Sequence, residues 1–258
     1  MRTVAQLARQ HGRSDEWVRT KLAQHSVPLP TQQPRPVAIV MDVTYFGSWG
    51  VLVVIDPNAN TLAGENLVLY YAFLEGSERT IHYETALDTL EAMGYVVTGA
   101  TIDGRRGVRE LLETRSVPVQ YCQFHQLQTI TRCLTRRPYL PQNRALRAIA
   151  LTLPTTTEVQ LTAELDAWHE ANGEWLKQKE PGTDRYVHPR TRRAYFSLRR
   201  NLPYLFTYQG AADLSIPNTT NALDGRFGVW KGMLHRHRGC SRALKTKLLR
   251  SLFVGLQR

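Results

Sequence analysis

Cysteine is scarce in this sequence. The 258 residues contain only Cys122, Cys133 and Cys240, an odd number at widely separated positions, and no Cys-x-x-Cys pair. This usage argues against a disulfide framework and a zinc ribbon, and it fits reduced thiols in a cytosol. Stability must therefore come from an apolar core, for which a hydrophobic content of 42% is sufficient.

Long apolar runs are absent as well. No run in the sequence reaches the roughly 20 residues that a membrane-spanning helix needs. The first residues, MRTVAQLARQ, lack the apolar core of a signal peptide. We therefore expect no membrane partner and a cytoplasmic protein, associated with the nucleoid if the host is bacterial.

Acidic residues are few relative to basic ones. Lys and Arg number 33 against 22 Asp and Glu, which gives a net charge of +11. This balance predicts a polyanionic partner, and charge alone leaves open whether that partner is nucleic acid or an anionic membrane surface. The imbalance is greatest from residue 218 onward, where Asp224 is the only acid. A helix that carries a carboxylate among so many cations favours contact with a DNA backbone, although a charge run is ordinarily a solvated face.

The first 27 residues predict a helix-turn-helix. Ala8, Gly12 and Val18 occupy the offsets typical of that motif. We expect its first helix to begin after Thr3, and Ser14 is a good N-cap for the second helix. The pattern fits either a motif that recognises DNA or a two-helix hairpin with a purely structural role. A linker rich in proline follows at residues 28–36.

Five strands are predicted after the linker: three that follow one another at short spacing, and two that alternate with helices. The apolar run Val37–Met41 indicates a buried strand that ends in Asp42, and Gly50–Ile55 and Asn66–Phe73 follow at short spacing, which favours an antiparallel meander. After a helix capped by Ser77 and ended by Gly94, strands are expected at Tyr95–Ile102, which ends in Asp103, and at Val117–Phe124. A short helix over 108–114 separates these two. This is the order of a ribonuclease-H-like α/β mixed sheet.

Helices are expected in the rest of the chain. Residues 126–216 show no recurring strand pattern and fit a helical insertion, and the final stretch fits one long helix or a pair, interrupted by Gly232 and Gly239. The domains that we predict are a helix-turn-helix appendage at 1–27, a linker at 28–36, the first part of the catalytic core at 37–125, the helical insertion at 126–216 and the C-terminal helical part of the core at 217–258.

Asp42 and Asp103 are candidate metal ligands. A carboxylate at the end of an apolar strand is costly unless a cation compensates it. Two such groups on neighbouring strands repel each other, and a divalent ion resolves that repulsion. A pair of Mg²⁺ ions can activate a water or a 3′-hydroxyl for in-line displacement at phosphorus. The alternative is that each Asp caps a turn.

The sequence also resembles a family, from about residue 37 to its end. The segments MDVTYFG (41–47), TIDGRRG (101–107), CQFHQLQTI (122–130) and TTNALDGRFG (219–228) are similar to transposases of bacterial insertion sequences and mutator-like elements. The segments at 186–208 and 235–239 resemble one insertion-sequence branch. The resemblance implies a ribonuclease-H-like fold and a catalytic, metal-binding triad of Asp42, Asp103 and Asp224. It also implies that Asp42 bridges two Mg²⁺ ions, which Mn²⁺ can replace, while the other two acids hold one each.

The third acid departs from the family, which has a glutamate where this chain has Asp224. An aspartate is shorter by one methylene, which costs about 1 Å of reach, and productive geometries are held to roughly half of that. The shorter third acid is compatible with three interpretations: a working triad, a weakened enzyme, or a decayed copy of the transposase.

The resemblance also includes a Cys-x-x-His motif, here Cys122 and His125. Without further nearby ligands no zinc site is expected, and both side chains are predicted to pack at the end of the fifth strand, with His125 near the acidic site or in contact with phosphate. Asn221 either caps its helix or orients a ligand. Tyr195, Phe196 and Trp230 either stack on unpaired bases or pack in the core.

The function that we expect is Mg²⁺-dependent hydrolysis of DNA at the ends of a mobile element, followed by transfer of the 3′-hydroxyl into target DNA. The alternatives are a nuclease without strand transfer and a decayed transposase that only binds DNA. The partners would be double-stranded terminal inverted repeats and target DNA, with a homodimer or larger assembly. The residues expected to contact DNA are Arg13, Arg19, Arg105, Arg106, Arg192, Arg193, Arg226, Lys231, Arg236 and Arg238.

Overall fold

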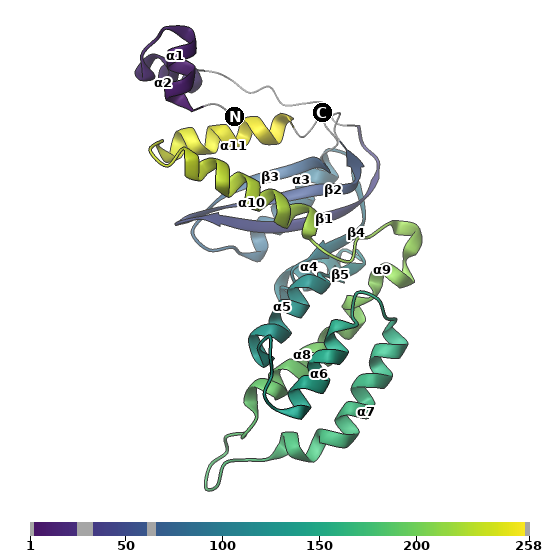
Figure 1. Ribbon diagram of the computed structural model, residues 1–258. Helices are drawn as coiled ribbons and strands as arrows, with labels where there is room; N and C mark the ends of the chain where they lie inside the picture. The colour runs from purple at the N-terminus through teal and green to yellow at the C-terminus, as the bar shows by residue number, and fades with distance from the viewer. Residues whose placement is uncertain (1–2, 25–32, 61–65, 256–258) are drawn as a thin grey trace. The chain divides into compact units, whose positions relative to one another are not determined.

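Three long antiparallel strands begin the sheet of the computed structural model, which describes residues 3–24, 33–60 and 66–255 (Figure 1). They are β1 (Pro36–Phe46), β2 (Trp49–Asn60) and β3 (Asn66–Glu75). β4 (Val96–Ile102) and β5 (Val119–Tyr121) pair in parallel. The five strands form one mixed sheet in the order β3-β2-β1-β4-β5, which confirms the predicted ribonuclease-H-like α/β fold.

The helices follow the predicted order. Their bounds are α1 (Val4–His11), α2 (Asp15–Gln24), α3 (Thr80–Ala92), α4 (Arg106–Thr114), α5 (Gln123–Leu134), α6 (Pro141–Leu151), α7 (Glu158–Lys177), α8 (Pro189–Leu205), α9 (Thr207–Gly210), α10 (Asn221–Arg236) and α11 (Arg242–Gly255), with a 3-10 turn η1 (Ala212–Leu214). The described residues form two compact units, one within Met1–Val97 and Asn221–Arg258 and the other within Thr98–Thr220. The domain boundaries given above stay a prediction.

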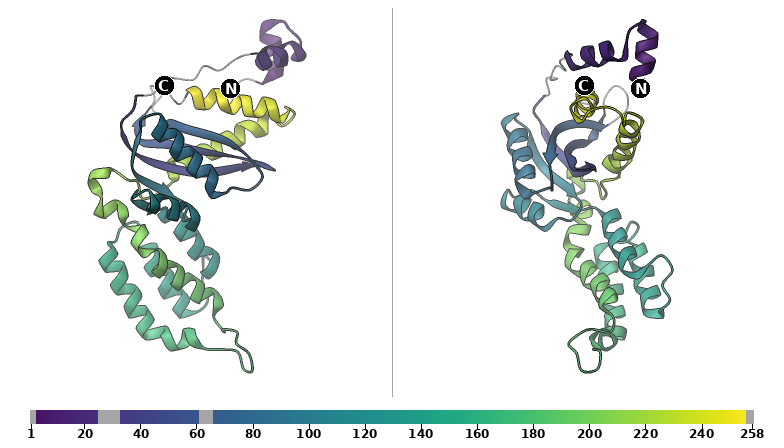
Figure 2. Two further views of the ribbon diagram at one scale, coloured as in Figure 1. Left: turned by 180° about the vertical axis from the view of Figure 1, so that it is seen from behind. Right: turned by 90° about the vertical axis from the view of Figure 1, so that its left-hand side faces the viewer.

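The core of the first unit lies between the meander and the C-terminal helices. α10 and α11 cover one face of β1–β3, and α3 covers the opposite face (Figure 2). Buried side chains such as Val51 and Val53 from β2 pack against Phe227 and Trp230 from α10 and Phe253 from α11. Such aromatic burial contributes roughly 1.5–3 kcal/mol for each side chain. The apolar stripe of α10 thus fixes that helix on the sheet.

Two predicted strands are longer than the apolar runs that indicated them. β1 continues for four residues past Asp42, because the two-residue turn that includes Gly47 brings Trp49 back opposite Phe46. The prediction that this strand ends in Asp42 is therefore wrong. β2 also runs past Ile55 through the turn-like residues 56–60, where its register with β3 shifts.

Three other boundaries also differ from the prediction. The fifth strand ends at Tyr121, because Cys122 is already the N-cap of α5. Ser77 does not cap α3, which begins at Thr80. The predicted linker lies partly outside the described residues, and Pro36 belongs to β1 rather than to the linker. Apolar periodicity indicated none of these three boundaries.

The N-terminal helix pair forms as predicted. The Thr3 side chain accepts a hydrogen bond from the Gln6 backbone, and Gly12 ends α1 in the left-handed conformation with a φ of 58°. Ser14 Oγ accepts a hydrogen bond from the Trp17 backbone at the start of α2, which fits an N-cap. The two helices share a small core of Val4, Ala8 and Val18. Whether the pair reads DNA stays a prediction.

The second unit carries the helical insertion. α5, α6, α7 and α8 pack on one another, and α8 also contacts β5. The Gln120 and Gln123 side-chain amides donate to the Leu205 carbonyl at 3.0 and 2.9 Å, which ties the end of α8 to the sheet. The expected helices over 126–216 are confirmed, with an isolated bridge between Lys179 and Tyr186 in addition. None of the helices that the structure describes has the length and apolar character to cross a membrane.

A substitution at Gly99 tests the packing in the second unit. A Cβ atom added there would lie 2.3 Å from Ile216 Cδ1, so Gly99→Ala must displace that side chain. We expect a loss of about 1–3 kcal/mol in the free energy of unfolding, measured by denaturant titration.

Gly228→Ala is the matched control, because a Cβ atom there meets nothing within 4 Å. Since Ala is the better helix former, this variant should be more stable by up to about 1 kcal/mol. Equal stability of the two variants would contradict the packing described for Gly99.

Candidate metal centre

Asp42 lies in the middle of β1, opposite Val53 of β2. The five residues before it are buried, whereas Asp42 itself is only partly buried. Its Oδ1 accepts a hydrogen bond of 2.7 Å from the Val43 backbone. The bond fixes the orientation of the carboxylate, which offers two acceptor oxygens in all.

Asp224 lies in the first turn of α10. A carboxylate is favourable there, because the N-terminal end of a helix carries a partial positive charge. Its neighbours Leu223 and Phe227 are buried against the meander, while Asp224 is partly buried. The packing of α10 therefore places the carboxylate at the edge of the core of the first unit.

Two side chains of the first unit form a metal-binding group. Asp42 and Asp224 each offer one carboxylate oxygen, and these two atoms lie within 4.8 Å of each other. Two ligands on opposite sides of one Mg²⁺ ion are about 4.2 Å apart, twice the usual bond length. The spacing is compatible with one divalent ion between the two oxygens. Carboxylates suit Mg²⁺ and Mn²⁺.

His125 belongs to α5 and not, as predicted, to the end of the fifth strand. Its position depends on Cys122 and Thr220 in the same unit. Cys122 Sγ accepts hydrogen bonds of 3.3 Å from both the backbone N–H and the hydroxyl of Thr220. The same hydroxyl lies 3.4 Å from His125 Nδ1. This contact orients the ring, and Thr220 is a site residue that we did not predict.

The thiol of Cys122 is electrostatically unusual for a buried cysteine. Burial raises its pKa, but hydrogen bonds from His125 and Thr220 outweigh this effect and hold the pKa below its ordinary value. Cys122 is not one of the ligand atoms in the metal-binding group. Its hydrogen bonds fit a positioning role.

Asp103 follows β4 directly, as predicted. Its Oδ1 accepts a hydrogen bond of 3.2 Å from the Arg105 backbone, a turn interaction of the kind that we considered as the alternative to metal binding. Asp103 is not part of the metal-binding group. Its role as a metal ligand stays a prediction. Asn221 is the exposed first residue of α10, and its role stays a prediction.

Most of the predicted DNA contacts lie on the surface. Arg192 and Arg226 are partly buried, and the exposed residues are Arg13, Arg19, Arg105, Arg106, Arg193, Lys231, Arg236 and Arg238. The Arg192 guanidinium lies 3.6 Å from the Tyr186 ring and donates to the Leu176 carbonyl, so it has structural partners. Tyr195 and Trp230 are buried, which confirms core packing for both. Phe196 is 40% exposed.

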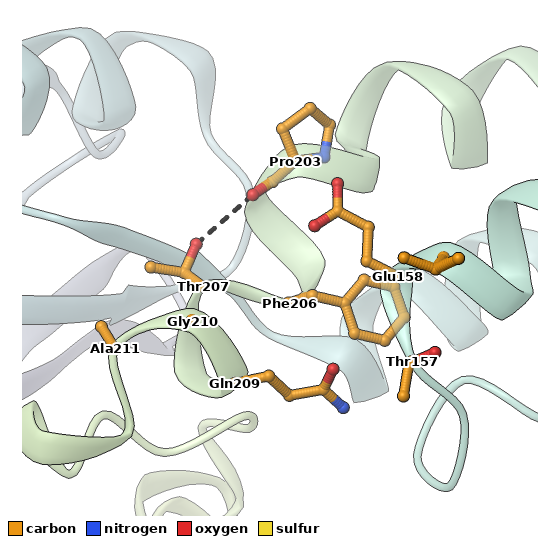
Figure 3. A pocket seen from close by; sticks show the side chains of 9 residues that line it. Thr157, Glu158, Pro203, Phe206, Thr207, Gln209, Gly210 and Ala211 are labelled. Atoms are coloured by element: carbon orange, nitrogen blue, oxygen red, sulfur yellow. Dashed lines mark hydrogen bonds between the residues drawn. The ribbon is translucent and has the colours of Figure 1, made fainter.

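A separate cavity of about 550 Å³ lies in the second unit (Figure 3). Its walls come from the start of α7, the end of α8 and α9, and Glu158 is the only ionisable residue among them. It shares no residue with the metal-binding group. No sequence motif pointed to this cavity.

The chain matches no family model, and no curated protein matches it significantly. The resemblance to transposases therefore rests on the motifs quoted above, together with the fold and the metal-binding group.

Thr220→Val tests the cluster around Cys122. The substitution removes the hydroxyl that donates to Cys122 Sγ and preserves the side-chain volume. Because that hydroxyl stabilises the thiolate, we expect the pKa of Cys122 to rise. Titration of the cysteine ¹³Cβ chemical shift measures it. Thr220→Ser, which keeps the hydroxyl, is the control, and an unchanged pKa in Thr220→Val would refute the assignment.

Proposed function

We propose that this protein is a DNA transposase that cleaves phosphodiesters and joins the new 3′-hydroxyl to target DNA. The observation that carries the proposal is the group of Asp42, on the central strand of a ribonuclease-H-like sheet, and Asp224, on the helix that packs against this sheet. Carboxylates gathered at one point repel each other, and a divalent cation removes that repulsion. The motifs around these residues resemble those of insertion-sequence transposases.

Asp42 and Asp224 would hold the ion, and Asp103 and His125 are proposed as further ligands. A bound Mg²⁺ or Mn²⁺ ion would supply Lewis-acid activation of the attacking oxygen and stabilise the leaving oxygen. The chain contributes the fixed geometry: the Val43 N–H orients the Asp42 carboxylate, and Thr220 orients the His125 ring. Pre-organisation of this kind lowers the cost of reaching the transition state.

The position of the Asp224 carboxylate supports a working catalytic site more than a decayed one. A shorter acid could have left its carboxylate out of reach, but its ligand atom lies within 4.8 Å of that of Asp42. We propose that α10 compensates for the missing methylene by its position on the sheet. A nuclease without strand transfer has the same site requirements, so the joining step must be tested directly.

Asp42→Asn should abolish cleavage. We expect nicking of a supercoiled plasmid by the purified chain with Mg²⁺ or Mn²⁺, a loss with EDTA, and a loss of at least about 100-fold in the variant, because the attacking oxygen is no longer activated. Gel electrophoresis measures the nicked fraction.

Asp88→Asn is the control, since Asp88 is an exposed acid on α3. Joining of a labelled 3′ end to the plasmid distinguishes a transposase from a nuclease. If the wild-type chain never nicks DNA with either metal, the proposal that it is an enzyme is refuted.

Asp224→Asn and Asp224→Glu test the third acid. Mn²⁺ binding, measured by isothermal titration calorimetry, should be lost in the first variant because a charged ligand is removed. It should persist in the second, which keeps the charge. If both variants bind Mn²⁺ as the wild type does, Asp224 is not a ligand.

A further inference from the structure

The N-terminal helix pair is packed against the C-terminal helices of its own unit. Cys240, in the turn between α10 and α11, contacts the small core formed by Val4, Ala8 and Val18. α2 also contacts α11 directly. The helix pair is therefore not an isolated appendage, and α2 and α11 together present a continuous surface.

A groove with a volume of about 390 Å³ lies between α2 and α11. Its walls carry two cationic side chains, Arg19 and Lys247, and two hydroxyl side chains, Thr20 and Ser241. A guanidinium, an ammonium and hydroxyl donors are the groups that contact phosphate oxygens in protein–DNA complexes.

None of the residues that line the groove is acidic. The chain has no Asp or Glu after Asp224, so α11 contributes only cations. The acids of α2 are Asp15 and Glu16 in its first turn, and neither lines the groove. Arg242 pairs with Glu75 and does not line it either. The groove is thus complementary to a polyanion.

We propose that this groove binds the phosphodiester backbone of duplex DNA, and this rests on the proposed function. α10 joins Asp224 at its first turn to the turn before α11. At 1.5 Å per residue, the twelve residue-to-residue steps from Asp224 to Arg236 span about 18 Å, or roughly five base pairs of duplex. A phosphate held in the groove would set which bond of the same duplex reaches Asp224. Arg19 and Lys247 are thus positioning residues.

Duplex binding without catalysis tests the groove. The full chain is titrated in EDTA against a labelled duplex of arbitrary sequence, and fluorescence anisotropy gives the affinity at several salt concentrations. Arg19→Ala/Lys247→Ala should bind about 10-fold or more weakly, and the slope of log K against log salt should fall by about 2, because two phosphate contacts are lost. Arg19→Lys/Lys247→Arg should restore most of the slope.

The control is Lys177→Ala/Arg185→Ala, which removes two exposed cations of the second unit and should change affinity and slope little. An equal loss in both double variants would show a generic charge effect and overturn the groove. If inorganic phosphate at the same phosphate concentration competes as well as the duplex, the groove binds free phosphate instead and the proposal fails. A wild-type chain that binds no duplex refutes the proposed function itself, whereas normal binding by the Arg19/Lys247 variant refutes only the groove.

Discussion

The repulsion between the Asp42 and Asp224 carboxylates is the constraint on which the first unit depends. Two unit charges within 4.8 Å of each other repel by about 3.5 kcal/mol or more at an effective dielectric constant of 20. Packing of α10 offsets this cost, since Leu223, Phe227 and Trp230 are buried against the sheet. A divalent cation would turn the same arrangement into a favourable one, so the apolar stripe of α10 holds together two carboxylates that such an ion would stabilise.

Apolar periodicity predicted which elements form, and local turn chemistry decided where they end. The continuous run before Asp42 correctly indicated a buried strand. Its extension to Phe46 depends on the turn at Gly47 and on pairing with β2, neither of which an apolar run reveals. Likewise the fifth strand is cut short at Tyr121 because the chain turns into α5 at Cys122. Alternating apolar residues alone do not distinguish a strand end from a helix start.

The candidate site was predictable only in part. Asp42 was found because a charged side chain after an apolar run coincided with a family motif, whereas Asp224 was found from the family motif alone. His125 was expected at the end of the fifth strand, but it lies on α5, which begins one residue after Cys122. No feature of the sequence indicated Thr220 as a site residue, because a threonine before a helix is ordinarily interpreted as its N-cap. Its contact with Cys122 joins segments 98 residues apart, which periodicity cannot show.

The two cores of the first unit differ greatly in size, and this difference bears on how DNA would act. α10 and α11 share a large apolar cluster with the sheet, whereas the N-terminal helices rest on Val4, Ala8 and Val18 with Cys240 beside them. So small a core contributes only a few kcal/mol. A ligand that contacts both α2 and α11 favours the packed arrangement by its differential affinity for it. DNA bound in the groove would therefore stabilise the packing of the N-terminal helix pair against α11. Because α10 joins α11 to the metal-binding group, the same contact would affect the position of Asp224.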